Sequence, residues 1–127
     1  MRNDAAQAQP SHETSLRQRL RTALVAAMKE RDRVAVTALR SALAAIDNAE
    51  AVDATAVASG SLAIESSPVG IGGAEAGRRA LSGEDIAQIV RSEVADREAA
   101  ALEYDRAGRP ERAEPLRAEA RVLSSYL

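Results

Sequence analysis

Apolar side chains recur at helical spacing in the first part of the chain and again in its last third. In residues 16–28 every fourth position is apolar, which places these side chains on one face of a helix. Ser15 and Gln18 form a capping-box pair in front of this helix, and the pattern ends near Arg31. The apolar face consists of Leu16, Leu20, Leu24 and Met28.

A second helical pattern follows after a short break. Asp32 is suited to cap it, because a carboxylate at that position can accept hydrogen bonds from free backbone amides. The apolar positions then step by three, four and three residues, which is the spacing of a seam between antiparallel helices. They are Val36, Leu39, Leu43 and Ile46. The tight connection predicts that the first two helices form a hairpin.

Residues 51–81 interrupt this pattern. They contain all but two of the glycines, many serines and alanines, and no sustained helical period. A stretch of this length without periodicity is unusual inside a compact domain. We therefore expect a long flexible insert here. Residues 1–14 are polar and aperiodic, and we expect them to form a disordered tail.

Helical order returns at Ser82, which pairs with Asp85 in a second capping box. Gly108 provides a left-handed stop after the third helix, and Pro110 suits the first position of a fourth. The predicted apolar faces are Ile86, Ile89, Val90, Val94, Ala101 and Leu102 in the third helix, and Leu116, Ala120, Leu123 and Leu127 in the fourth.

Pro115 complicates the fourth helix, because a proline inside a helix removes a hydrogen bond and bends the axis. Either the helix starts at Pro115 or its first turn is kinked. In both cases the sequence predicts an all-α protein with four helices, arranged as two antiparallel hairpins joined by a flexible insert at about 51–81. Residues 15–127 then form a single helical domain.

The composition excludes several kinds of chemistry. The chain has no cysteine, and its single histidine, His12, lies in the expected tail. We therefore predict no catalytic residue, no metal site and no cofactor. The N-terminal residues lack a signal-peptide pattern, and no apolar run is long enough to span a membrane. We expect a cytoplasmic protein without a membrane partner.

The stretch "GGAEAGRR" has the glycine spacing of a phosphate-binding loop but not its other residues. Gly72 and Gly77 match the two glycines of such a loop. Arg78 stands where a lysine is needed, and Arg79 stands where a hydroxyl group would bind magnesium. We interpret the stretch as part of the linker.

Charge is distributed unevenly, although the formal net charge is only −2. Ser15–Ile46 carries seven basic and two acidic residues, whereas Glu84–Arg121 carries seven basic and ten acidic ones. A basic edge attracts phosphate or carboxylate groups. The candidate contacts are Arg31, Arg33 and Arg40. The basic part has no aromatic residue, so it lacks a stacking platform for unpaired bases.

Arg97 falls on the apolar face of the third helix, so we expect it to be partly buried. A buried guanidinium needs a carboxylate partner. Glu50 or Asp47, at the end of the second helix, would supply one and form a structural polar clamp. The other charges of the third helix alternate in sign, as in the i,i+4 pair Glu93 and Arg97, which is typical of a solvated face.

These segments together resemble the GatB/YqeY family, and in particular its YqeY-like proteins. The matching segments are "AMKERDRVAVTALRSALAAIDNAE" and "EDIAQIVRSEVADREAAALEYDRAGRPERAEPLRAEARVLSSYL". Shared features are "AMK" followed by "RD", "LR", "NAE", a charged third helix ending in "EY", and the "AGR" turn. The resemblance covers about Ser15–Glu50 and Ser82–Leu127.

The resemblance implies a protein similar to the C-terminal helical region of the B subunit of aspartyl/glutamyl-tRNA amidotransferases. Those enzymes convert Glu-tRNA(Gln) or Asp-tRNA(Asn) to the amide, with glutamine as the nitrogen donor. Other parts of the enzyme perform the chemistry, and the helical and tail regions help to engage tRNA. The family pattern continues past "YL" into a small helical tail domain. We expect this chain to lack that domain, which carries much of the expected tRNA contact.

Three functions follow as hypotheses. The first is a non-catalytic accessory module that binds tRNA, an amidotransferase or another translation protein. The second is a protein–protein adaptor or homodimer without an RNA role, in which alanine-rich, aromatic-poor seams gain burial against a partner. The third is a subunit of a glutamine-dependent carbon–nitrogen ligase that is active only with other subunits.

Overall fold

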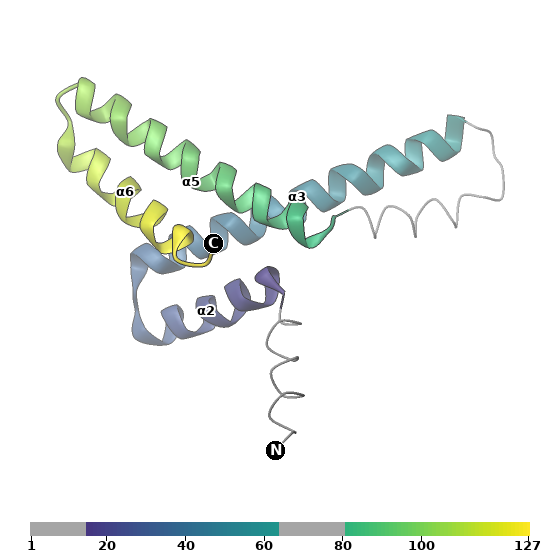
Figure 1. Cartoon of the computed structure of the whole chain (residues 1–127), viewed down its shortest axis with the longest axis horizontal. Helices are drawn as coiled ribbons and strands as arrows, with labels where there is room; N and C mark the ends of the chain where they lie inside the picture. The colour runs from purple at the N-terminus through teal and green to yellow at the C-terminus, as the bar shows by residue number, and fades with distance from the viewer. Residues whose placement is uncertain (1–14, 64–80) are drawn as a thin grey trace, which may run out of the picture.

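The computed structural model describes residues 15–63 and 81–127, and all regular structure within these ranges is helical (Figure 1). The helices are α2 (Leu16–Glu30), α3 (Arg33–Ala63), α5 (Gly83–Arg106) and α6 (Pro110–Ser124). The prediction of an all-α fold with four helices is confirmed for this part of the chain. The expected N-terminal tail with His12, and the glycine-rich stretch at residues 72–79, lie outside the described residues.

The helices form two antiparallel hairpins, called here the first hairpin (α2 and α3) and the second hairpin (α5 and α6) (Figure 1). The second hairpin begins with the predicted capping box. Ser82 Oγ accepts a hydrogen bond from the amide of Asp85 at 3.0 Å, and Asp85 Oδ2 accepts one from the amide of Ser82 at 2.9 Å. At the start of the first hairpin, Ser15 Oγ accepts a hydrogen bond from the amide of Gln18 at 3.1 Å.

The turn of the first hairpin is built on Arg31, which has a positive φ of 58°. The amide of Arg31 donates to the carbonyl of Met28 at 3.2 Å, and the amide of Asp32 donates to the carbonyl of Ala27 at 3.0 Å. This pair of bonds is the Schellman pattern that satisfies the last carbonyls of a helix. Asp32 then caps α3 as predicted, because its Oδ1 accepts a hydrogen bond from the amide of Ala35 at 3.1 Å.

The turn of the second hairpin has the same geometry around Gly108, whose φ is 74°. The amide of Gly108 donates to the carbonyl of Asp105 at 3.0 Å, and the amide of Arg109 donates to the carbonyl of Tyr104 at 2.8 Å. Pro110 occupies the start of α6. A backbone N–H at this position would have no acceptor within the helix, so its absence in proline costs no hydrogen bond. The predicted glycine stop and proline start are both confirmed.

Pro115 lies inside α6, so the alternative in which the helix begins at Pro115 is wrong. The capping signal at residues 108–110 determines the start of the helix. Pro115 has no N–H to donate to the carbonyl one turn earlier in the helix. Because Pro115 is exposed, water can donate to that carbonyl instead.

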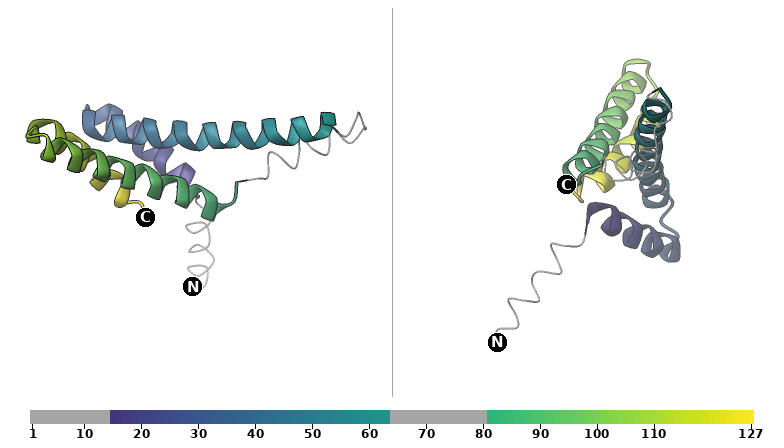
Figure 2. Two further views of the ribbon diagram at one scale, coloured as in Figure 1. Left: turned by 90° about the horizontal axis from the view of Figure 1, so that it is seen from above. Right: turned by 90° about the vertical axis from the view of Figure 1, so that its right-hand side faces the viewer.

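The largest departure from the prediction is the length of α3, which was expected to end near Glu50 and continues to Ala63. The expectation of a flexible insert is therefore wrong for residues 51–63. These residues are rich in alanine, which favours a helix without requiring an amphipathic pattern. Figure 2 shows the distal part of α3 extending past the other helices.

One hydrophobic core joins all four helices. Its largest fully buried side chains are Leu20, Leu39, Ile46, Val90 and Leu123. Alanines fill much of the remaining space and allow the helices to approach closely. They are Ala27, Ala35, Ala38, Ala42 and Ala120.

Three residues assigned to apolar faces are exposed instead: Met28 by 49%, Leu102 by 47% and Leu127 by 52%. For Met28 the reason is geometric. Each step of four residues advances about 40° around a helix of 3.6 residues per turn, so a strict four-residue pattern drifts off the buried face. Ala27 takes the buried position in that turn of α2.

Candidate functional site: the cationic surface of the first hairpin

The three predicted anion contacts all lie on the exposed surface of the first hairpin. Arg31 forms the turn between α2 and α3, and Arg33 opens α3. Arg40 lies two helical turns beyond Arg33 and therefore projects from the same face of α3. The structure thus places Arg33 and Arg40 on one surface of α3, and Arg31 lies in the turn just before this helix.

Few of the described cations of the first hairpin form ion pairs. Within residues 15–52 and 81–127, its only ion pair joins Arg17 to Glu50 at 3.0 Å, with the Arg17 side chain 20% exposed. The remaining cations are exposed, and no described carboxylate lies within ion-pair distance of them. They are Arg19, Arg21, Lys29, Arg31, Arg33 and Arg40.

The second hairpin differs, because most of its arginines already have carboxylate partners. These pairs are Arg91–Glu84, Arg97–Glu93, Arg97–Glu119, Arg106–Glu103, Arg109–Glu111, Arg117–Asp105, Arg117–Glu114 and Arg121–Glu114. A carboxylate beside a guanidinium cancels much of its field, so an external anion is attracted less strongly. The first hairpin is therefore the part of the described surface best suited to bind an anionic partner.

The side chain of Arg97 extends from α5 to a carboxylate of α6 and is only 12% exposed. Its Nε donates to Glu119 Oε1 at 2.9 Å, and its Nη1 donates to Glu93 Oε1 at 2.8 Å. Glu93 Oε1 also accepts a hydrogen bond from Ser41 Oγ of α3 at 3.1 Å. These bonds connect three helices through one partly buried polar cluster.

The predicted partners of Arg97 were wrong. Glu50 pairs with Arg17 of α2 instead, and Asp47 is exposed. The sequence indicated that Arg97 needs a carboxylate, but not which helix lies over that face of α5. Since α6 returns directly along α5, Glu119 supplies the carboxylate from within the second hairpin.

The pKa of Arg97 responds to opposing effects. Burial lowers it, because desolvation disfavours the charged form, while the hydrogen bonds and the negative charges of Glu93 and Glu119 raise it. The balance places the pKa of Arg97 above its ordinary value. Arg97 is therefore cationic at every physiological pH and acts as a permanent link between α5 and α6.

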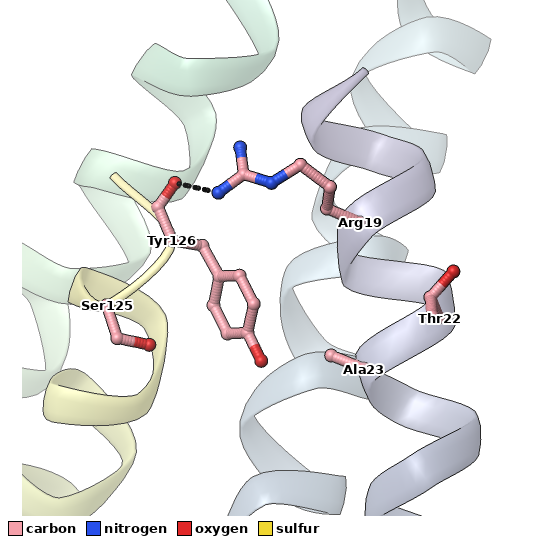
Figure 3. Close-up of a pocket in the computed structure, with 5 residues that line it drawn as sticks. All are labelled: Arg19, Thr22, Ala23, Ser125 and Tyr126. Carbon is pink, nitrogen blue, oxygen red and sulfur yellow. Dashed lines mark hydrogen bonds between the residues drawn. The ribbon is translucent and has the colours of Figure 1, made fainter. Parts of the chain in front are cut away.

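A groove lies where α2 passes the end of α6, and Figure 3 shows its lining residues. Its volume is about 460 Å³, and it is lined by Arg19, Thr22, Ala23, Ser125 and Tyr126. Arg19 Nη2 donates to the carbonyl oxygen of Tyr126 at 3.1 Å. The Arg19 guanidinium carbon lies 5.9 Å from the centre of the Tyr126 ring, within the range of a cation–π contact.

The sequence does not predict this groove, because the basic segment itself contains no aromatic residue. Tyr126 comes from the other end of the chain, 107 residues from Arg19. The fold therefore brings an aromatic ring to the cationic hairpin after all. No signal in the sequence connects these two residues, since the contact depends on how the two hairpins pack.

Other classes of site find no support in the described ranges. No cluster of three or more histidine or acidic side chains within them is arranged to hold a metal ion. None of the described helices has both the length and the apolarity needed to cross a membrane.

The fold defines a small all-helical protein in which two hairpins share one core and one hairpin keeps exposed cations. A family model described as Yqey-like protein matches residues 73–127, which include α5 and α6. Residues 73–127 are therefore similar to the YqeY-like family, and that part of the resemblance is confirmed. The relation to the tRNA-dependent amidotransferases stays a prediction. The chain has no significant match among curated proteins or among solved structures.

Proposed function

We propose that this chain is a non-catalytic accessory module of the cytoplasmic translation machinery, and that it binds the phosphates of tRNA with the cations of its first hairpin. The observation that supports this proposal is the contrast in charge pairing. The exposed cations of α2 and α3 form no ion pair with a described carboxylate, whereas those of α5 and α6 are mostly paired.

Phosphate contacts of this kind have a defined physical signature. Each cation that neutralises a phosphate releases condensed counterions, so the logarithm of the affinity falls linearly with the logarithm of the salt concentration. The slope counts the phosphates contacted, at roughly 0.9 per contact on a duplex. Because such contacts carry no base specificity, tRNA identity would be read elsewhere in the assembly.

The test compares two triple variants of the full chain that remove the same formal charge. Arg31, Arg33 and Arg40 are replaced by alanine in one, and Arg106, Arg109 and Arg112 of the second hairpin in the other. Binding of fluorescently labelled tRNA is followed by anisotropy over a series of salt concentrations. The first-hairpin variant should lose about two to three units of salt slope and at least roughly ten-fold in affinity at low salt.

The second-hairpin variant is the control for net charge, because its three arginines are also exposed. It should retain nearly the wild-type slope. Equal losses in both variants would mean that tRNA responds only to net charge, and the proposed binding surface would then be wrong. Absence of tRNA binding by the wild type would contradict the proposal as a whole.

A protein–protein adaptor is the second candidate function, supported by apolar exposure on α2. Val25 is 54% exposed and Met28 is 49% exposed on the outer face of this helix, between Arg21 and Lys29. Apolar anchors flanked by cations suit an acidic amphipathic helix of a partner protein. A partner captured by the wild type but not by Val25→Asp, in the absence of RNA, would favour this function.

A further inference from the structure

We propose that the groove between α2 and the end of α6 binds one unpaired nucleotide of the RNA, with the base against the ring of Tyr126 and the phosphate at Arg19. The inference rests on the proposed function, because the exposed cations of the first hairpin would supply most of the RNA affinity. The groove would recognise single-stranded RNA, whereas the exposed cations of the first hairpin would bind only phosphate groups.

The volume and the lining residues of the groove suit a nucleotide. Its volume of about 460 Å³ lies within the usual range for small-molecule sites. Figure 3 shows the ring of Tyr126 between the end of α6 and α2, with Arg19 across from it. Thr22 and Ser125 also line the groove, and Ser125 Oγ donates to the carbonyl of Val122 at 2.7 Å while its lone pairs can still accept. Hydroxyl groups can hydrogen-bond a base edge or a ribose 2′-OH.

Arg19 retains the capacity to bind a phosphate. Its Nη2 donates to the Tyr126 carbonyl, but a guanidinium carries five N–H donors, so others stay free for phosphate oxygens. Within the described ranges no carboxylate pairs with Arg19, and its charge is therefore not neutralised locally. The bond to Tyr126 also fixes the guanidinium beside the aromatic ring, which places the two recognition elements next to each other.

A second, smaller pocket shows why this groove is the better candidate. That pocket, of about 180 Å³, is lined by Glu98, Arg117, Ala120 and Arg121 on the second hairpin. Its arginines already pair with carboxylates, and Glu98 would repel a phosphate. It also has no aromatic ring among its lining residues.

Stacking on Tyr126 selects for unpaired RNA, because both faces of a base inside a duplex are covered by its neighbours. Stacking of a base on an aromatic side chain is tolerant of sequence. The groove should therefore distinguish single-stranded from double-stranded regions and should not distinguish one base strongly from another.

The experiment uses Tyr126 as its own reporter. The chain contains two tyrosines and no tryptophan, so a full-length Tyr104→Phe variant emits from Tyr126 alone. It is titrated with a blunt RNA hairpin and with the same hairpin carrying a short unpaired 3′ extension, while anisotropy of the labelled RNA reports binding. The extended RNA should quench roughly half of the emission at saturation, and the blunt RNA should bind with little quenching.

The outcomes separate this inference from the proposed function. If both RNAs bind by anisotropy but the extension causes no additional quenching, the groove inference is overturned and the phosphate-binding surface stands. If neither RNA binds, the proposed function fails and the groove inference fails with it. Quenching by adenosine monophosphate but not by the extended RNA would identify a free-nucleotide site and would also overturn the inference.

A matched pair of variants tests the groove without removing Tyr126, which packs against the core. Thr22→Leu adds bulk at a residue that lines the rim of the groove, and Val25→Leu makes a similar change on the outer face of the same helix. Both positions are exposed, so both variants should melt like the wild type. Thr22→Leu should reduce the preference for the extended RNA by about five- to ten-fold, and Val25→Leu should not. Equal preferences in the two variants would contradict the site.

Discussion

In the second hairpin most described arginines lie beside a carboxylate, whereas in the first hairpin only Arg17 does. The pairs of the second hairpin include contacts that connect its two helices, such as Arg97 with Glu119 and Arg117 with Asp105. Its charges therefore support its own architecture. Among the described residues the exposed cations of the first hairpin form no ion pair, although Arg19 donates a hydrogen bond to the Tyr126 carbonyl. The charges of the second hairpin therefore mainly stabilise the fold, whereas most of those of the first hairpin are available to a partner.

The two turns show the same contrast in backbone geometry. Both close with a residue of positive φ and the same pair of hydrogen bonds, but the residue is Arg31 in the first hairpin and Gly108 in the second. Glycine adopts this conformation without strain, whereas for another L-residue it costs about 1–2 kcal/mol. An arginine held in a strained, exposed turn is consistent with a binding role, because strain concentrates at functional positions.

The largest effect should come from the core that unites the two hairpins. Ile46→Ala removes a fully buried side chain of α3 and should lower the free energy of unfolding by about 2–5 kcal/mol. Val52→Ala, at a position of the same helix that is 64% exposed, should change it by less than about 0.5 kcal/mol. Urea unfolding followed by circular dichroism measures both. Similar losses in the two variants would contradict the packing of α3.

A smaller effect should distinguish the buried ion pairs of the second hairpin from its exposed ones. Arg97→Ala leaves Glu93 and Glu119 without their cation, and the free energy of unfolding should fall by about 2–3 kcal/mol. Arg91→Ala breaks a pair whose side chains are 45% and 78% exposed, and it should cost less than about 1 kcal/mol. Thermal melts of the two variants provide the measurement. A more stable Arg97→Ala variant would show that desolvation of the Arg97 charge costs more free energy than its ion pairs and hydrogen bonds contribute.

The smallest effects should appear at the two turns and should have opposite signs. A Cβ at Gly108 would meet no atom within 4 Å, so Gly108→Ala should destabilise the chain by about 1 kcal/mol through backbone strain alone. Arg31→Gly relieves the corresponding strain and should stabilise the chain by up to about 1 kcal/mol. Chemical denaturation of both variants is the measurement. A loss of stability in Arg31→Gly would indicate that the arginine side chain makes a stabilising contribution to the turn.

The features predicted correctly from the sequence are those set by local chemistry. The capping box of Ser82 and Asp85, the cap at Asp32 and the left-handed stop at Gly108 each involve residues that are neighbours in the chain. A short polar side chain or a glycine at such a position needs little tertiary information to act. These signals located three of the helix ends and, with them, both hairpins.

The features that were missed depend on packing between distant segments. Arg97 was correctly placed on the inner face of α5, but its partner Glu119 follows from the way α6 lies along that face. Tyr126 reaches Arg19 only because the second hairpin ends beside α2. The length of α3 was missed for a different reason. Periodicity detects a helix that has one apolar side, whereas an alanine-rich segment can form a helix without that pattern.

The long helix α3 also affects how the molecule rotates in solution. Its 31 residues span about 46 Å at 1.5 Å per residue, roughly twice the length of the 15-residue helices α2 and α6. A particle with one long arm tumbles anisotropically, faster about the arm than end over end. Backbone N–H vectors lie along the axis of their helix, so the relaxation of each amide in a magnetic field depends on the direction of its helix as well as on local motion. The helices should therefore relax at different rates even where all are equally rigid.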